Sequence, residues 1–317
     1  MNVHTTFAGN YPWDPVRSLH FDELESTRDD VDLYIGMRHE KPINADKINV
    51  FIDFEQPNTW YGGPDDAPFK HALSREQTFD KIFTIHEPIV AKRNSILGVD
   101  RYKYVFFPFN MKHAPQLTED KKYDFFFSGH WYGAGYCLHR EVIVPAFDTL
   151  ISQIDNFSHY IVSGYAAPGV PSGRGISYDQ KLAENSKSKI SIAYNHQEIS
   201  PRFHGMIPRL QAEITDIRKD ATGHYCINQH KARVIEGFMS KTLVLIYNDP
   251  YNSIEDFWVP NEHFIYYYDK NDLVSKVIDI RENYYSDKYQ KIINAGHEHT
   301  KKEYSVQQFY NKYIKDL

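Results

Sequence analysis

The chain has few cysteines, no long apolar run and no compact metal-binding motif. Only two cysteines, Cys137 and Cys226, occur in 317 residues, which excludes a disulfide framework and predicts a reducing, cytoplasmic environment. No apolar stretch approaches the roughly 18 residues of a membrane span, and the first residues lack a signal-peptide pattern. The 16 histidines are scattered, without an H-E-x-x-H motif or a Cys/His cluster, so no metal site is expected.

Positive charges are outnumbered by negative ones, with 36 Lys and Arg against 42 Asp and Glu. The net charge is −6 and the isoelectric point about 6.2, which argues against a general polyanion-binding surface but leaves room for a local basic groove. Aromatic residues are abundant, with 24 Tyr and 20 Phe, a surplus typical of interfaces and of stacking on ligand rings. The length suits two globular domains of ordinary size.

Short apolar runs in the first third of the chain predict an open parallel sheet of α/β type. Strands are expected at residues 31–36, 47–57, 78–88 and 103–110. The first segment, "MNVHTTFAGN", indicates a strand that leaves into a loop at Gly9 and Asn10. A glycine there lets the backbone approach a phosphate, although Gly-Asn is more often a simple turn.

A second series of strands begins after a polar linker at residues 111–122. Strands are expected at 123–129, 159–164, 189–195, 242–249 and 263–269, and residues 271–317 are expected to be helical with a candidate break at Gly296. The pattern predicts two successive α/β halves, residues 1–120 and 121–317, that face each other across a cleft.

The segment "QHKARVIEGFMSKTLVLIYND" joins a short helix to a buried strand. Its polar residues His230, Arg233 and Glu236 recur at i, i+3 and i+6, on a different face from the apolar stripe. They form either an exposed Arg–Glu pair, which stabilises a helix by about 0.2–0.5 kcal/mol, or part of a polar ligand site.

Polar residues collect at the predicted carboxyl ends of the strands, where open parallel sheets bind ligands. Arg140 falls in a helix that follows one of these ends. The residues at the strand ends are Asp53, Glu55, Gly129, Asn195 and Asp249.

Several segments resemble the C-terminal domain of GT-B glycosyltransferases, especially the spore-maturation-like group. The segment beginning "ARVIEGFMSKTLVLIYND" matches that group's pattern of Arg, two residues, Glu, a small-residue helix, an apolar strand and an acidic loop. "YDFFFSGHWYGAGYCLHREVI" and "GISYDQKLAENSKSKISIAYN" resemble earlier parts of the same domain. The resemblance covers about residues 123–300. It implies two Rossmann-like domains, with a last helix that commonly crosses back to the first.

Two further resemblances meet at "VFIDFEQP". The stretch resembles the surroundings of the catalytic aspartate in phage DNA β-glucosyltransferase, which implies that Asp53 is the base. It also resembles the Glu-x-Pro segment of α-1,3-fucosyltransferases, which implies Glu55 instead. Both side chains lie on one face of the strand, and the reserve candidates are His86 and Glu87 at the end of the next strand.

The resemblance implies a sugar transferase that uses a UDP- or GDP-sugar, a hydroxyl acceptor such as a glycan, and neither cofactor nor metal. Glu236 would bind the ribose, while Arg233 and Arg140 would bind the diphosphate. Inversion is favoured over retention. The alternatives are a non-catalytic sugar-binding protein and a nucleic-acid glycosyltransferase, the latter disfavoured by the acidic isoelectric point. The expected donor-binding residues are Gly129, Arg140, Asn195, His230, Arg233, Glu236 and Asp249, and the expected acceptor or phosphate loops contain Gly9, Asn10 and His86.

The residues between Asn195 and Gln229 have no counterpart in that resemblance. They contain Pro201, Arg202 and Pro208, and they form a candidate lid over the donor or the acceptor.

Overall fold

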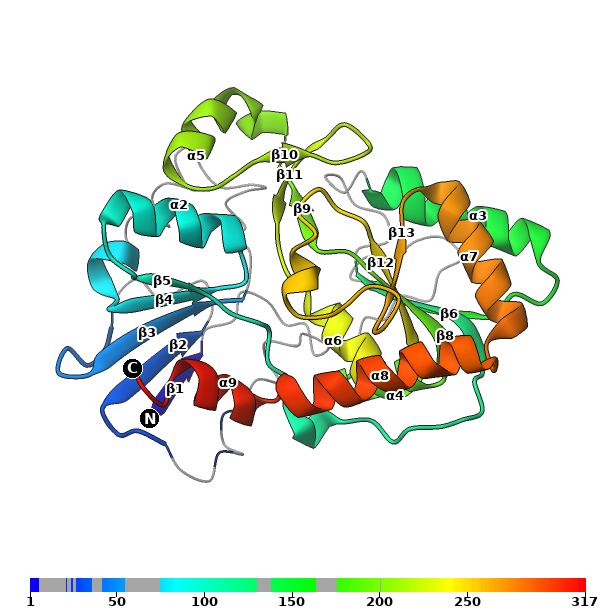
Figure 1. Cartoon of the computed structure of the whole chain (residues 1–317), viewed down its shortest axis with the longest axis horizontal. Helices are drawn as coiled ribbons and strands as arrows, with labels where there is room; N and C mark the ends of the chain where they lie inside the picture. The colour runs from blue at the N-terminus through cyan, green and yellow to red at the C-terminus, as the bar shows by residue number, and fades with distance from the viewer. Residues whose placement is uncertain are drawn as a thin grey trace.

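A computed structural model describes residues 1–5, 21, 24, 27–35, 42–54, 75–129, 138–163, 176–199 and 201–317, apart from the side chain of residue 202. In this part of the chain the strands form two five-stranded parallel sheets and one three-stranded antiparallel sheet (Figure 1). None of the helices in these ranges is long and apolar enough to cross a membrane.

The first sheet has the strand order β1-β2-β3-β4-β5. Its strands are β1 (Asn2–Thr5), β2 (Val31–Ile35), β3 (Ile48–Asp53), β4 (Lys81–Thr84) and β5 (Tyr102–Tyr104), and helix α2 (Glu87–Leu97) follows β4. The strand expected at residues 103–110 ends at Tyr104, because the chain leaves the sheet there and crosses toward the second half. Phe109 instead forms an isolated bridge with Ser305.

The second sheet has the strand order β13-β12-β8-β6-β7. Its strands are β6 (Tyr123–Gly129), β7 (His159–Ser163), β8 (Ser188–Ala193), β12 (Leu243–Tyr247) and β13 (Ile265–Tyr267). The chain runs from β6 outward to β7 and then returns to the other side of β6 to form β8. The strand order therefore reverses between β6 and β8, and such a reversal opens a crevice at the carboxyl ends of the two strands.

Helices cover both faces of the second sheet. On one face, Phe147 and Leu273 pack with Phe125 and Ile190 of the strands; on the other, α4 and α6 pack against Val244 and Ile246. The helical segments are η4 (Met111–His113), η5 (His139–Ile143), α3 (Val144–Gln153), α4 (Tyr178–Ser186), α6 (Ala232–Met239), η7 (Ser253–Asp256), α7 (Lys270–Asn283), α8 (Asp287–Glu303) and α9 (Val306–Tyr313).

The break expected at Gly296 is wrong, because this residue lies inside α8. A Cβ atom there would lie 2.6 Å from the carbonyl oxygen of His263 and 2.9 Å from the ring of Phe238. The glycine therefore allows a close approach between the helix and its neighbours rather than ending the helix.

The segment between β8 and α6 forms a small antiparallel unit of its own. It contains β9 (His196–Glu198), η6 (Pro201–Met206), α5 (Ile207–Glu213), β10 (Arg218–Lys219) and β11 (Tyr225–Asn228). Phe203, Leu210 and Ile227 belong to its separate apolar core. The unit reaches over the first half, where α5 lies beside α2 (Figure 1). Arg93 of α2 donates a hydrogen bond to the carbonyl of Glu213 in α5.

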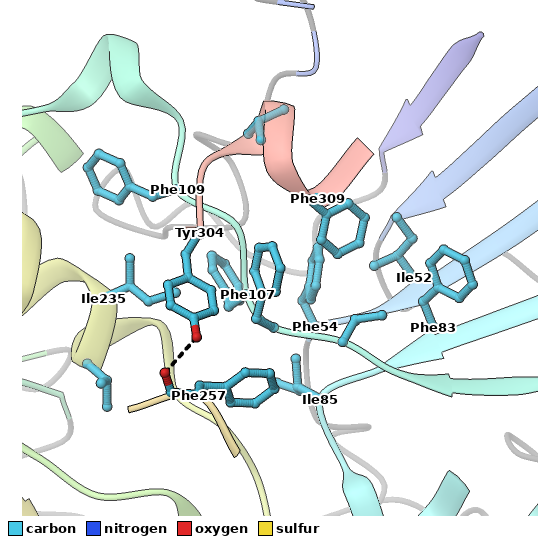
Figure 2. Close-up of a cluster of buried hydrophobic side chains, with 14 of the residues drawn as sticks. Ile52, Phe54, Phe83, Ile85, Phe107, Phe109, Ile235, Phe257, Tyr304 and Phe309 are labelled. Carbon is cyan, nitrogen blue, oxygen red and sulfur yellow. Dashed lines mark hydrogen bonds between the residues drawn. The ribbon is translucent and has the colours of Figure 1, made fainter. Parts of the chain in front are cut away.

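An aromatic core joins the two sheets (Figure 2). The chain leaves α8 and forms α9, which packs on the first sheet and places Phe309 5.9 Å from Phe54 between ring centroids. The amide of Phe109 donates to the carbonyl of Tyr304 at 2.8 Å. The Tyr304 hydroxyl donates to the carbonyl of Phe257 at 2.6 Å, so the two crossings of the chain share one buried cluster. The domain boundary at residues 120 and 121 stays a prediction.

Replacement of Phe309 tests whether this core holds the two halves together. The side chain is fully buried, so Phe309→Ala should lower the free energy of unfolding by about 3–5 kcal/mol. Tyr285→Ala removes an aromatic ring that is 65% exposed and should cost less than about 1 kcal/mol. Urea unfolding followed by tryptophan fluorescence measures both, and equal midpoints for the two variants would contradict the proposed role of α9.

Candidate functional site

Two predicted site residues lie at the point where the strand order of the second sheet reverses. Gly129 ends β6, and Asn195 follows the end of the neighbouring strand β8. The Asn195 side chain is buried: its Oδ1 accepts a hydrogen bond from the amide of Lys231 at 3.0 Å, and its Nδ2 has no partner among the described residues. The predicted strand ends are therefore adjacent in space.

Arg233 lies over this edge of the sheet, in the first turn of α6. Its guanidinium carbon is 4.5 Å from the centroid of the Tyr194 ring and 5.7 Å from that of Phe127. Gly129 makes room for it, since a Cβ atom at that position would lie 3.2 Å from both terminal nitrogens of Arg233. The Arg233 Nη1 atom is buried and has no hydrogen-bond partner in the part of the chain that the structure describes. A guanidinium with a free donor directed into a protein interior favours an anionic ligand.

Lys231 supplies a second cation at the same edge, and it is absent from the residues predicted from sequence. Its Nζ donates to the side-chain oxygens of Gln197, at 3.1 Å, and of Gln229. Burial, together with the nearby charge of Arg233, holds the pKa of Lys231 well below its usual range. A lysine just before a helix is common, so nothing in the sequence singles out Lys231. Only its contacts with the side chains of Gln197 and Gln229 in the fold do so.

No carboxylate within the described ranges pairs with Lys231 or Arg233. The ion pairs of this region involve other residues: Glu236 pairs with Lys181 at 2.7 Å. Lys231 and Arg233 are half-buried side by side without an acidic partner among the described residues, and this disfavours a charge on Lys231 unless an anion binds between them. This arrangement suits a ligand with two or more negative charges.

Glu236 is buried in α6, with its Oε1 bonded to Lys181 of α4. The i, i+3 pair between Arg233 and Glu236 therefore does not form, and neither side chain is an exposed surface group. A buried pair is expensive to desolvate, and the loss of one partner leaves an uncompensated charge, so Glu236 and Lys181 depend on each other energetically. Its expected contact with a ribose stays a prediction.

His230 and His86 connect the two halves of the molecule. His230 is fully buried between Phe257 and Trp258, both of its ring nitrogens lack partners among the described residues, and burial lowers its pKa to about 3. The Nδ1 of His86 lies 2.6 Å from the carbonyl of Asn228, so this nitrogen carries the proton and Nε2 keeps a free lone pair. Burial lowers the pKa of His86 to about 4, so both rings are neutral at pH 7.

Asp53 lies at the carboxyl end of β3, next to Thr84 at the end of β4. Its Oδ2 atom is 3.6 Å from Nη1 of Arg75. Burial raises the pKa of Asp53 to about 6, and the Arg75 charge opposes that rise. A carboxyl with a pKa near 6 is suited to proton transfer close to neutral pH. Glu55, the alternative base, lies outside the described residues.

The remaining predicted site residues are Arg140, Asp249, Gly9 and Asn10. Arg140 is in the π-helical segment η5, 70% exposed, where its Nη2 bonds to Glu141 at 3.1 Å rather than entering the interior. Asp249 follows β12 and is buried; its Oδ1 accepts from the amides of Tyr251 and Asn252. Gly9 and Asn10 lie outside the described residues.

Comparison with solved structures finds GT-B glycosyltransferases, at low sequence identity. TarM of S. aureus matches with a TM-score of 0.54 and 11% identity, over 90% of this chain and 54% of TarM. Sucrose-phosphate synthase of Thermosynechococcus elongatus matches with a TM-score of 0.55 and 8% identity, over 90% of this chain and 73% of that one. HepE of Anabaena in complex with UDP-glucose matches with a TM-score of 0.56 and 7% identity, over 91% and 79%.

These comparisons confirm the predicted GT-B architecture of two Rossmann-like units. The chain spans about half the length of TarM, 54%. No family model matches the chain, and no curated protein does.

The buried Oδ2 of Asp249, which has no hydrogen-bond partner within the described ranges, gives a stability prediction with a definite sign. Burial raises its pKa from 3.8 to about 7, so the folded state binds a proton that the unfolded state releases, and stability falls as the pH rises from 4 to 7. Asp249→Asn should therefore raise the free energy of unfolding at pH 8 by about 1–4 kcal/mol, and the gain should shrink toward pH 4.

Urea unfolding of the wild type and Asp249→Asn at pH 4, 6 and 8 measures this difference. Asp148→Asn, at an exposed position in α3, is the matched control and should differ little from the wild type at any pH. A gain for Asp249→Asn that stays constant with pH would contradict a protonated Asp249 in the folded state.

Proposed function

We propose that this chain is a glycosyltransferase that moves a sugar from a nucleotide-diphosphate donor to an acceptor hydroxyl. The observation that carries the proposal is the pair Lys231 and Arg233 at the reversal point of the second sheet, for which the described part of the chain provides no acidic partner. A diphosphate supplies the negative charge that Lys231 and Arg233 do not find in an acidic side chain among the described residues. The GT-B architecture supports the same ligand class, since the similar HepE structure is a complex with UDP-glucose.

In this proposal the donor is a UDP- or GDP-sugar, and the protein needs no resident cofactor. Lys231 and Arg233 hold the diphosphate and stabilise the charge that grows on it as the sugar leaves. Their cations supply that stabilisation without any step that requires a metal. Glu236 accepts hydrogen bonds from the ribose hydroxyls, and Lys181 keeps its carboxylate oriented. Asn195 and Gly129 shape the same edge of the sheet.

The acceptor is a glycan or another hydroxyl compound that enters from the side of the first sheet. Asp53 removes the proton of the acceptor hydroxyl, which then attacks the anomeric carbon opposite the leaving diphosphate and inverts it. Its raised pKa of about 6 favours this role, since the group is ionised yet basic at neutral pH. Glu55 is the alternative base, and the neutral His86 is the reserve.

Donor binding tests the cation pair directly. Arg233→Ala should weaken binding of UDP or GDP about 10- to 100-fold, since hydrogen bonds to charged groups contribute about 1.5–3 kcal/mol each. Calorimetry with UDP, GDP and their sugars measures the affinities and also shows whether the donor carries uracil or guanine. Arg209→Ala, at an exposed arginine, should bind like the wild type. Unchanged affinity in both Arg233→Ala and Lys231→Met would refute the proposed diphosphate site.

Turnover tests the proposed base. Asp53→Asn keeps the shape of the side chain and removes its basicity, so kcat should fall about 100-fold or more at pH 7.5 while donor affinity is kept. The wild-type rate should rise with pH through about 6, because the base acts only when ionised. Asp46→Asn, at an exposed residue before β3, should leave kcat unchanged. Near-normal rates in both Asp53→Asn and Glu55→Gln would exclude this inverting mechanism.

A further inference from the structure

Three potential metal ligands meet inside the antiparallel unit, although they are not adjacent in sequence. His196 and Glu198 lie two residues apart on one face of β9, and Asp220 follows β10. One ligand atom from each lies within 4.8 Å of the other two, and Nε2 of His196 is 3.6 Å from Oδ2 of Asp220. All three residues are buried, with exposed fractions of 2%, 5% and 6%.

The fold holds Asp220 with one oxygen occupied and the other directed at His196. Its Oδ1 accepts hydrogen bonds from the amides of Thr222 and His224 and from the Thr222 hydroxyl. Its Oδ2 is buried and has no hydrogen-bond donor within the described ranges. Among the described residues, no lysine or arginine lies within ion-pair distance of Asp220.

The other two side chains are also fixed in place. The Oε1 of Glu198 accepts from the amide of Leu138 at 2.9 Å, which orients the carboxylate. The His196 ring packs on Tyr247 with 5.4 Å between centroids, and its buried Nδ1 has no hydrogen-bond partner in the part of the chain that is described. Rings and backbone thus position an imidazole and two carboxylates. Asp220 in particular is buried without a lysine or arginine partner among the described residues, which is costly in free energy when the group is charged.

We propose that His196, Glu198 and Asp220 bind a divalent transition-metal ion of the Zn²⁺ class. One imidazole nitrogen and two carboxylate oxygens are ligands that Zn²⁺ accepts, with bond lengths of about 2.0–2.2 Å. Two such ligands in a tetrahedral shell lie about 3.4 Å apart, close to the 3.6 Å between His196 and Asp220. The divalent charge compensates the buried carboxylate of Asp220, whose Oδ2 has no hydrogen-bond partner among the described residues.

The ion has a positioning role in this proposal. It connects the start of β9, directly after Asn195, to the turn that follows β10, and so it fixes the antiparallel unit to the end of β8. Gln197 lies between His196 and Glu198 and points to the opposite face of β9, where it binds Lys231. The metal site and the cation pair are therefore on opposite faces of one strand. The inference does not depend on the proposed sugar transfer.

Metal retention by the full chain tests the site. The wild type, stripped with EDTA, reloaded with ZnCl₂ and passed through gel filtration, should retain one Zn²⁺ per chain by mass spectrometry and melt at a higher temperature than the stripped protein. Asp220→Asn, which is isosteric, and His196→Gln should each weaken Zn²⁺ binding about tenfold or more. His224→Gln changes a more exposed histidine of the same unit and should bind Zn²⁺ like the wild type.

The wild type alone gives a second readout that does not depend on variants that fold. Co²⁺ bound by one imidazole and two carboxylates should give visible d–d absorption without a sulfur-to-metal charge-transfer band. The proposal is overturned by a wild type that retains no Zn²⁺, by a charge-transfer band that shows thiolate ligation, or by equal binding in Asp220→Asn, His196→Gln and His224→Gln. The last outcome would identify adventitious binding to surface histidines.

Discussion

The aromatic core between the two sheets is the interaction on which the rest of the molecule depends. Each sheet is parallel and apolar, so each needs cover on both faces, and the first has few helices of its own in the described residues. Helix α9 supplies that cover from the far end of the chain, with Phe309 inserted beside Phe54 and Phe83. The same cluster continues to Trp258 and α6, and thereby sets where the first turn of α6 lies.

Electrostatics at the candidate site follow from this packing. Helix α6 is held by apolar contacts through Val234, Ile235 and Phe238, so its polar first turn must lie at the carboxyl ends of β6 and β8. Arg233 then lies over Tyr194, with 4.5 Å from its guanidinium carbon to the ring centroid and no acidic partner among the described residues. Apolar packing of α6 compensates the cost of placing Arg233 and Lys231 side by side.

The strand and helix ends at the site, which depend on neighbouring residues in the sequence, could be predicted. The strand ends at Gly129 and Asn195 and the helix that carries Arg233 follow from apolar periodicity and turn residues, and the GT-B architecture is confirmed. Contacts set by the path of the chain were not predictable. The partnership of Glu236 with Lys181 depends on how α4 packs on α6, and the meeting of His196 with Asp220 depends on an antiparallel pairing that no local pattern indicates.

The two passages of the chain between the sheets restrict how the halves move. The amide of Phe109 donates to the carbonyl of Tyr304, and the amide of Val306 donates to the carbonyl of Phe109, so the two crossings are joined at one place. On the other side of the molecule, α5 lies over α2 (Figure 1). In addition, the Nδ1 of His86 bonds to the carbonyl of Asn228. A relative movement of the halves that opens this side must break these contacts, so the antiparallel unit is a second attachment between the halves.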